Sequence, residues 1–121
     1  MEVVDGLCSV RPKGACSLVE AVDLVRSAIE RCRKRRIARL LFNATGLTGI
    51  PIPTLVDRFL MVEEWAATAK SMVAVALVVH AEYIHPKKFG VVLAADLGLT
   101  CDVHTSEVDA LRWLAEVNRS A

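Results

Sequence analysis

The chain has 121 residues, which is enough for one domain and too few for two. Its formal net charge is +1, so bulk charge favours neither a nucleic acid nor an acidic partner. Hydrophobic residues make up 54% of the chain and aromatic residues only 5%, which is typical of a buried sheet covered by helices. The longest apolar run, 72–79, is too short to span a membrane, and the start of the chain lacks the basic region of a signal peptide. We therefore expect a cytoplasmic protein.

The first third of the chain predicts a strand pair and a helix. Residues 3–11 read as weak strand with a turn at Gly6. Ser17 and Glu20 have the spacing of a capping box, which predicts a helix that runs out in the basic residues 31–36. The expected buried stripe of this helix recurs every three to four residues and consists of Leu18, Val22, Val25, Ile29 and Cys32.

The middle of the chain predicts a strand, a loop and a second helix. Residues 37–43 (IARLLFN) are apolar enough for a central strand, and 44–53, which contain two glycines and two prolines, predict a loop. The expected inner stripe of the following helix consists of Leu55, Phe59, Val62, Ala66 and Ala69. Residues 72–79 form the clearest buried strand.

The last third predicts two more helices around one short strand. Pro86 suits the first position of a helix after a loop at 80–85, and Gly98 suits its end. A strand follows at 99–104, and Thr105 or Ser106 caps the last helix. The expected inner face of that helix consists of Val108, Leu111, Leu114 and Trp113.

This order of elements predicts a single α/β domain over residues 1–121, with a mixed, mainly parallel sheet of four to five strands and about four helices. The chain lacks a phosphate-binding GxxxxGK[ST] loop, a GxGxxG dinucleotide motif and a CxxC pair. The four cysteines are expected to be reduced, partly buried thiols. No nucleophile–base pair can be assembled from spacing, so we predict no enzyme, no cofactor and no metal site.

Three stretches resemble a known family: LLFNATGLTGI, EEWAATAKSMVAVALVV and FGVVLAADLGLTCDVHTSEVDALRWLAE. Together they resemble the SpoIIAA-like branch of the STAS domain superfamily over nearly the whole chain. The resemblance implies a mixed sheet with helices on one face or partly around it, and a regulatory module that docks a protein partner. Members that act as anti-sigma-factor antagonists carry a phosphorylated serine at the start of the second helix. Here the corresponding loop reads GIPIPT, and its only hydroxyl residue is Thr54.

Polar residues near the expected strand ends and the second helix start form the candidate partner or ligand surface. They are Asn43, Thr45, Thr54, Asp57, Arg58, His80 and His104. The two histidines either bind an anion or a metal, or merely end their strands; no third ligand is visible by spacing. Thr54 is either a phosphoacceptor at an anion-binding helix start or an ordinary N-cap with Asp57 at N3.

Charged residues elsewhere have simple interpretations. Asp57, Arg58, Glu63 and Glu64 are expected to form a solvated helix face. The basic run 31–39 is interpreted as a solvated helix end rather than a nucleic-acid site, since cations are favoured at a helix C-terminus.

Two functional hypotheses follow. The first is a regulatory, non-catalytic module that docks a protein partner. The alternative is a carrier of a small apolar ligand or lipid, suggested by the large aliphatic content. A homodimer through an exposed N-terminal edge strand is a further hypothesis.

Overall fold

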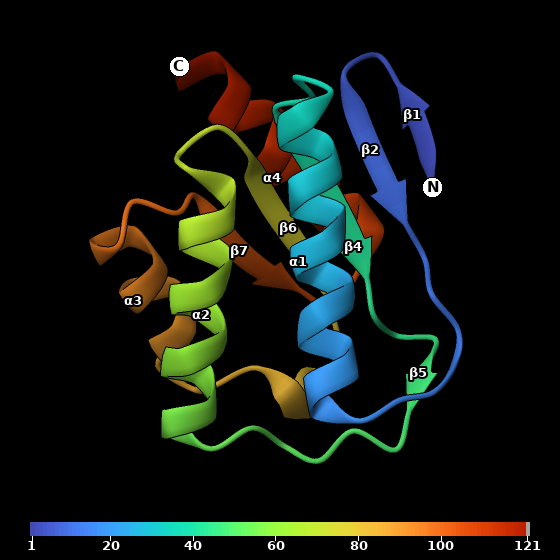
Figure 1. The fold of residues 1–121 in the computed structure, drawn as a ribbon, viewed down its shortest axis with the longest axis vertical. Coiled ribbons are helices and arrows are strands. Elements are labelled where there is room, and N and C mark those ends of the chain that lie inside the picture. The colour runs from blue at the N-terminus through green and yellow to red at the C-terminus, as the bar shows by residue number, and fades with distance from the viewer. Residues whose placement is uncertain (121) are drawn as a thin grey trace.

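The computed structural model describes residues 1–120, which form a five-stranded mixed sheet between two layers of helices (Figure 1). The spatial order of the strands is β1-β2-β4-β6-β7. Their bounds are Glu2–Val4 (β1), Leu7–Val10 (β2), Arg39–Asn43 (β4), Ala74–Val78 (β6) and Cys101–His104 (β7). The strand β1 lies at the edge and pairs antiparallel with β2, whereas the other pairs are parallel. The predicted mixed, mainly parallel sheet and its N-terminal hairpin are confirmed.

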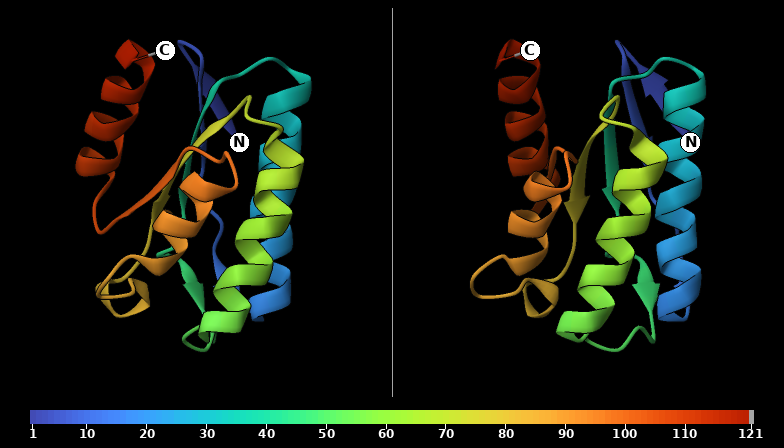
Figure 2. Two further views of the ribbon diagram at one scale, coloured as in Figure 1. Left: turned by 90° about the vertical axis from the view of Figure 1, so that its left-hand side faces the viewer. Right: turned by 60° about the vertical axis from the view of Figure 1, so that its left-hand side comes forward.

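Helices cover both faces of the sheet (Figure 2). Three lie on one face: α1 (Leu18–Lys34), α2 (Leu55–Ala69) and α3 (Phe89–Asp96). Each joins two neighbouring parallel strands, and right-handed crossovers in one direction across the sheet place all three on the same side. The last helix, α4 (Glu107–Ser120), follows the edge strand and packs on the opposite face.

The central strands carry apolar residues on both faces because both faces are covered. Leu40 and Phe42 of β4 pack toward α1 and α2, whereas Leu41 between them packs toward α4. All five residues of β6 are buried. This explains the unbroken apolar run from which a doubly covered strand was predicted.

The predicted inner stripes of two helices are wrong in part: Val62 and Ala69 of α2 and Leu114 of α4 are buried as expected, whereas other members are not. The buried face of α2 consists of Arg58, Val62, Trp65 and Ala69, and the expected Leu55 and Phe59 are exposed. The helix is apolar nearly all round at its start, so its hydrophobic pattern fits more than one stripe.

In α4, Val108 and Leu111 are exposed, whereas Ala110 and Leu114 are buried. The small side chain of Ala110 lets the helix approach the sheet, and a pattern search for large apolar residues overlooks it. Trp113 is half-buried at the edge of this face. Ser106 caps the helix by accepting a hydrogen bond from the N–H of Asp109 at 3.2 Å.

The loops also differ from the prediction in two places. The third helix begins at Phe89 and not at Pro86, because Lys88 adopts a left-handed conformation with φ of 48° that a continuous helix excludes. The loop 44–53 contains a short strand, β5 (Leu47–Thr48), which pairs with β3 (Gly14–Ala15) in a second small sheet. A Cβ at Gly46 would lie 2.7 Å from the carbonyl oxygen of Pro12, so this close approach requires glycine.

All four cysteines are free thiols, and Cys8 and Cys32 are fully buried. Within residues 1–120, no helix is both long enough and apolar enough to cross a membrane.

Candidate ligand-binding cavity

A cavity of about 120 Å³ lies beneath α2, between α1 and the carboxyl ends of β4 and β6. Ligands in open α/β sheets bind at this end of the strands. Most of the lining is aliphatic or aromatic and comes from both helices, four strands and two loops. These apolar residues are Leu18, Ala21, Val22, Val25, Phe42, Ala44, Leu47, Ile50, Pro53, Met61, Trp65, Leu77, Val79 and Val103. Tyr83, His80 and Arg58 are the polar members of the lining.

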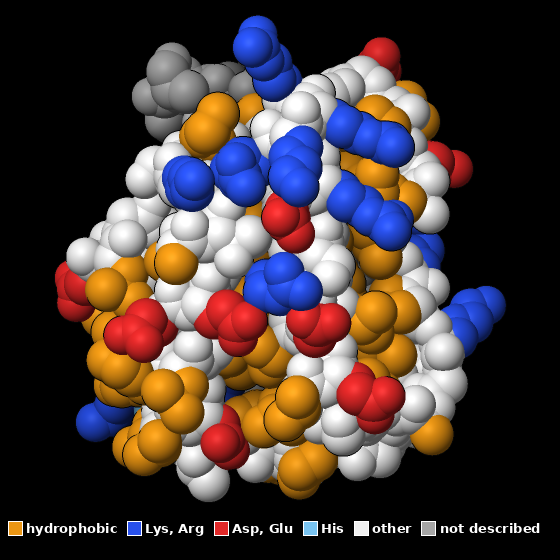
Figure 3. Space-filling model, in the orientation of Figure 1, with side chains coloured by type: hydrophobic (Ala, Val, Ile, Leu, Met, Phe, Trp, Pro, Cys, Tyr) orange, Lys and Arg blue, Asp and Glu red, His pale blue; other side chains and the backbone are white. Residues whose placement is uncertain are grey.

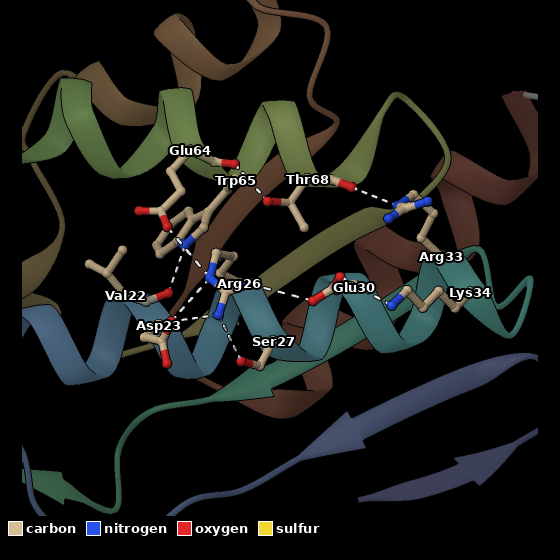
Figure 4. Close-up of polar contacts among 10 residues, drawn as sticks. All are labelled: Val22, Asp23, Arg26, Ser27, Glu30, Arg33, Lys34, Glu64, Trp65 and Thr68. Atoms are coloured by element: carbon tan, nitrogen blue, oxygen red, sulfur yellow. Dashed lines mark hydrogen bonds and ion pairs between the residues drawn. The ribbon is translucent and has the colours of Figure 1, made fainter.

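Polar contacts between α1 and α2 fix one wall of the cavity (Figure 4). The indole of Trp65 points from α2 toward α1, and its Nε1–H donates to the carbonyl oxygen of Val22 at 3.1 Å. Farther along, the Arg33 guanidinium donates to the carbonyl oxygen of Thr68 at 2.9 Å. Between them, Arg26 on α1 lies 3.5 Å from Glu64 on α2. The two helices are therefore held together at three levels, and the wall is preformed.

Two loops meet at the mouth of the cavity. The hydroxyl of Tyr83, at the end of the short 3-10 helix η1 (Ala81–Tyr83), donates to the carbonyl oxygen of Ile50. The ring nitrogen Nε2 of His80 lies 3.1 Å from the carbonyl oxygen of Thr45. These contacts tie the segment that follows β4 to the segment that follows β6. The closure is made by side chains that lie outside the five-stranded sheet.

Arg58 is the charged residue of the cavity wall. Arg58 is only 8% exposed, so the prediction that it belongs to a solvated helix face is wrong. Its Nη1 donates to the carbonyl oxygen of Tyr83 at 3.1 Å. Arg58 also lines a smaller adjoining cavity of about 40 Å³. In the part of the chain that the structure describes, no carboxylate lines either cavity and Arg58 forms no ion pair.

The structure divides the predicted site residues among three places. Arg58 and His80 line the cavity, and Thr45 reaches it only through the contact of its carbonyl oxygen with His80. Thr54 and Asp57 form a capping box at the start of α2: the Thr54 hydroxyl accepts from the N–H of Asp57 at 3.0 Å, and the Asp57 carboxylate accepts from the N–H of Thr54 at 2.9 Å. The predicted N-cap pair is confirmed.

Asn43 belongs to a polar cluster at the α4 side of the same strand ends. Its side-chain oxygen accepts from the N–H of Thr45 at 3.0 Å, and its Nδ2 donates to Glu107 at 2.7 Å. Arg11 makes a two-pronged contact with the same carboxylate, at 2.8 and 2.9 Å. The hydrogen bond from Arg11, and then that from Asn43, hold the pKa of Glu107 at about 2.

His104 does not join His80. Its ring packs against Trp113 of α4 with ring centroids 5.7 Å apart, whereas His80 lies on the α2 side of the sheet. Burial lowers the pKa of His104, and its Nε2 is buried with no hydrogen-bond partner among the described residues. Across the described residues, no three His, Cys, Asp or Glu side chains gather as a metal site would require.

Sequence reasoning missed Tyr83 and Glu107 as site-forming residues, because their partners lie 33 and 64 or more positions away. The burial of Arg58 did leave a signal. Arg58, Val62, Trp65 and Ala69 recur every three to four residues, so the arginine occupies a position in the stripe that faces the core.

Comparisons with known proteins identified no relative of the chain. No protein-family model matches the chain, and searches of curated proteins and of solved structures found no match. The resemblance to STAS domains therefore rests on sequence motifs alone.

Proposed function

We propose that the chain is a non-catalytic binding module that holds a small apolar ligand in the cavity beneath α2. The observation that carries the proposal is the cavity itself, which has a lining of mainly aliphatic and aromatic side chains. Its volume of about 120 Å³ is close to that of an engineered apolar cavity of roughly 150 Å³ that binds benzene. A ligand of this size would replace the missing contacts of the lining side chains.

The position of Trp65 in the cavity wall provides a direct test. The chain contains two tryptophans, so a Trp113→Phe background leaves Trp65 as the sole indole reporter. We expect saturable changes in its emission when a neutral probe of suitable size, benzyl alcohol, is titrated. Native mass spectrometry of the freshly purified protein is expected to show a bound small molecule that is released on denaturation.

A pair of alanine substitutions supplies the control. Ala21→Leu places a larger side chain in the cavity from α1 and is expected to abolish the probe response. Ala67→Leu makes the same change on the exposed side of α2 and is expected to leave the response intact. An emission change that does not saturate, or that persists in Ala21→Leu, together with no bound mass, would show that the cavity holds no ligand.

A second candidate function is protein docking in a groove between α1 and α2, as the STAS resemblance suggests. Figure 3 shows acidic side chains of both helices around apolar side chains in the lower half of this face. The groove measures about 410 Å³, and its exposed apolar residues are Val19 and Leu60. Its carboxylates are those of Glu20, Asp23, Asp57 and Glu64. Arg26 contacts Asp23 and Glu64, so acidic groups remain in excess. The partner that this charge favours is a basic amphipathic helix of another protein.

Peptide selection tests the docking candidate without a known partner. Random peptides displayed on phage are selected on the wild-type protein and counter-selected on a Glu20→Lys, Asp57→Lys double variant. Glu82→Lys, an exposed reversal outside the groove, is the matched control. We expect recovered peptides to combine Lys or Arg with leucine at helical spacing and to bind less well in high salt. Recovery of acidic peptides, or of peptides that bind the double variant equally, would contradict this candidate.

A further inference from the structure

We propose that the ligand of the cavity is an anion, a small apolar carboxylate whose charge is held by Arg58. This inference rests on the proposed ligand-binding function and adds the chemical class of the ligand. Its basis is a buried arginine that faces an apolar cavity with a single protein hydrogen-bond acceptor and no acidic partner in the described chain.

Acceptors of the described residues use little of the hydrogen-bonding capacity of Arg58. A guanidinium has five N–H donors in a planar fork, and here one contact, from Nη1 to the carbonyl oxygen of Tyr83, is present. A charge removed from water costs several kcal/mol unless it is paired and hydrogen-bonded, and arginine is almost never buried without such a partner. Among the described residues, no carboxylate lines the cavity and no side chain accepts a hydrogen bond from the fork. A ligand carboxylate would satisfy it through two parallel hydrogen bonds.

The other ionisable groups around Arg58 also favour an anion. His80 lines the same cavity, and His85 and Lys88 line the smaller cavity on the other side of Arg58. The ammonium group of Lys88 forms an ion pair at 2.9 Å with the carboxylate of Asp102, which lies on β7. Apart from the Tyr83 hydroxyl and the Cys101 thiol, the ionisable side chains that line these two cavities are therefore those of arginine, lysine and histidine. An anionic ligand would meet a positive wall, whereas a cationic ligand would be repelled.

The rest of the lining determines what the anion must carry. Phe42, Trp65 and Leu77 present apolar surface in the same space that Arg58 borders. An inorganic anion would leave this surface without contacts, and a neutral hydrocarbon would leave the guanidinium unpaired. A monocarboxylate with an apolar body of about the size of a benzene ring satisfies both.

Benzoate and benzyl alcohol test this inference, because they have closely similar apolar bodies and differ in charge. Trp65 emission in the Trp113→Phe background is followed at constant ionic strength. We expect benzoate to bind at least about tenfold more tightly than benzyl alcohol to the wild-type chain. Arg58→Met is expected to remove this preference while it retains binding of benzyl alcohol. Arg39→Met is the matched control, since Arg39 also donates to a backbone carbonyl, that of Asp5, but lies outside both cavities.

The outcomes separate this inference from the function on which it rests. Equal affinity of the two probes for the wild-type chain would overturn the anion proposal and leave the apolar cavity as a ligand site. A benzoate preference that persists in Arg58→Met would place the anion elsewhere and also overturn it. If neither probe alters Trp65 emission, both the anion proposal and the proposed function are wrong.

Discussion

The guanidinium of Arg58 and the backbone carbonyl of Tyr83 lie 3.1 Å apart and join the second helix to the loop that closes the cavity. This contact connects the charge in the cavity wall to the segment that follows β6. Tyr83 in turn holds the opposite loop through its hydroxyl and Ile50. Three parts of the chain therefore meet at one point of the cavity rim.

Arg58→Met is expected to stabilise the ligand-free protein. It replaces a buried, unpaired charge by an apolar side chain of similar length, a kind of exchange that is often neutral or favourable. We expect a gain of about 1 kcal/mol, or roughly 3–5 °C in the melting temperature. Thermal denaturation after removal of any bound molecule by refolding measures the change. A loss of stability greater than about 2 kcal/mol would show that the arginine serves mainly the fold.

Glu107→Gln is expected to destabilise the protein in a pH-dependent way. The folded-state pKa of Glu107, about 2, lies below its ordinary value of 4.5, so the carboxylate stabilises the fold above pH 4.5. This contribution is lost as the pH falls through the interval from 4.5 to 2. We expect the variant to lose about 1–2 kcal/mol at pH 7, through the weakened contacts with Arg11 and Asn43, and to match the wild type near pH 2. Urea denaturation at several pH values provides the measurement.

Glu63→Gln is the control for this pH dependence, because the exposed Glu63 carboxylate has no ion pair or hydrogen bond within the described residues. Its stability difference from the wild type is expected to stay small, within about 0.5 kcal/mol, at every pH. A constant deficit for Glu107→Gln down to pH 2 would contradict the assigned role of the charge.

Local patterns in the sequence predict much of this fold. The capping boxes at Ser17 and Thr54 and the glycine at Gly98 mark helix ends correctly, because each is satisfied within a few residues. The alternation of elements gives the parallel sheet. Which side of α2 is buried could not be read from the same pattern, because the helix carries apolar residues on several sides.

The site depends on contacts between residues that lie far apart in the sequence. Thr45 and His80 were candidates by their position after strands, and the sheet does bring them together. Tyr83 joins them only because the loop after β6 folds back over the loop after β4. His104 is the last residue of the neighbouring strand β7, yet its side chain faces the other side of the sheet. The positions of strand ends therefore predict which residues lie at the same edge of the sheet. Which face of the sheet each side chain points to depends on the alternation of side chains along its strand.

Thr54→Ala is expected to lower stability by about 1 kcal/mol, because it removes the hydroxyl that accepts the Asp57 N–H at the start of α2. Thr54→Ser is expected to retain most of the stability. Thr105→Ala serves as the control, since Thr105 is exposed and the neighbouring Ser106 caps α4. Chemical denaturation monitored by circular dichroism measures all three. Equal stability of Thr54→Ala and Thr105→Ala would show that the cap contributes little.

Tyr83→Phe is expected to loosen the mouth of the cavity while the sheet keeps its stability. The change removes one hydrogen bond to Ile50 and leaves the aromatic ring in place. We expect faster amide hydrogen exchange in residues 44–53, with exchange in β4 and β6 unchanged. Dissociation of a bound probe is expected to be about fivefold faster, the equivalent of roughly 1 kcal/mol. Ser71→Ala removes a similar hydrogen bond, to the carbonyl of Gly98, away from the cavity and is expected to change neither property. Uniformly faster exchange across the sheet would instead mean that Tyr83 stabilises the whole domain, and the two loops would not act as a separate closure.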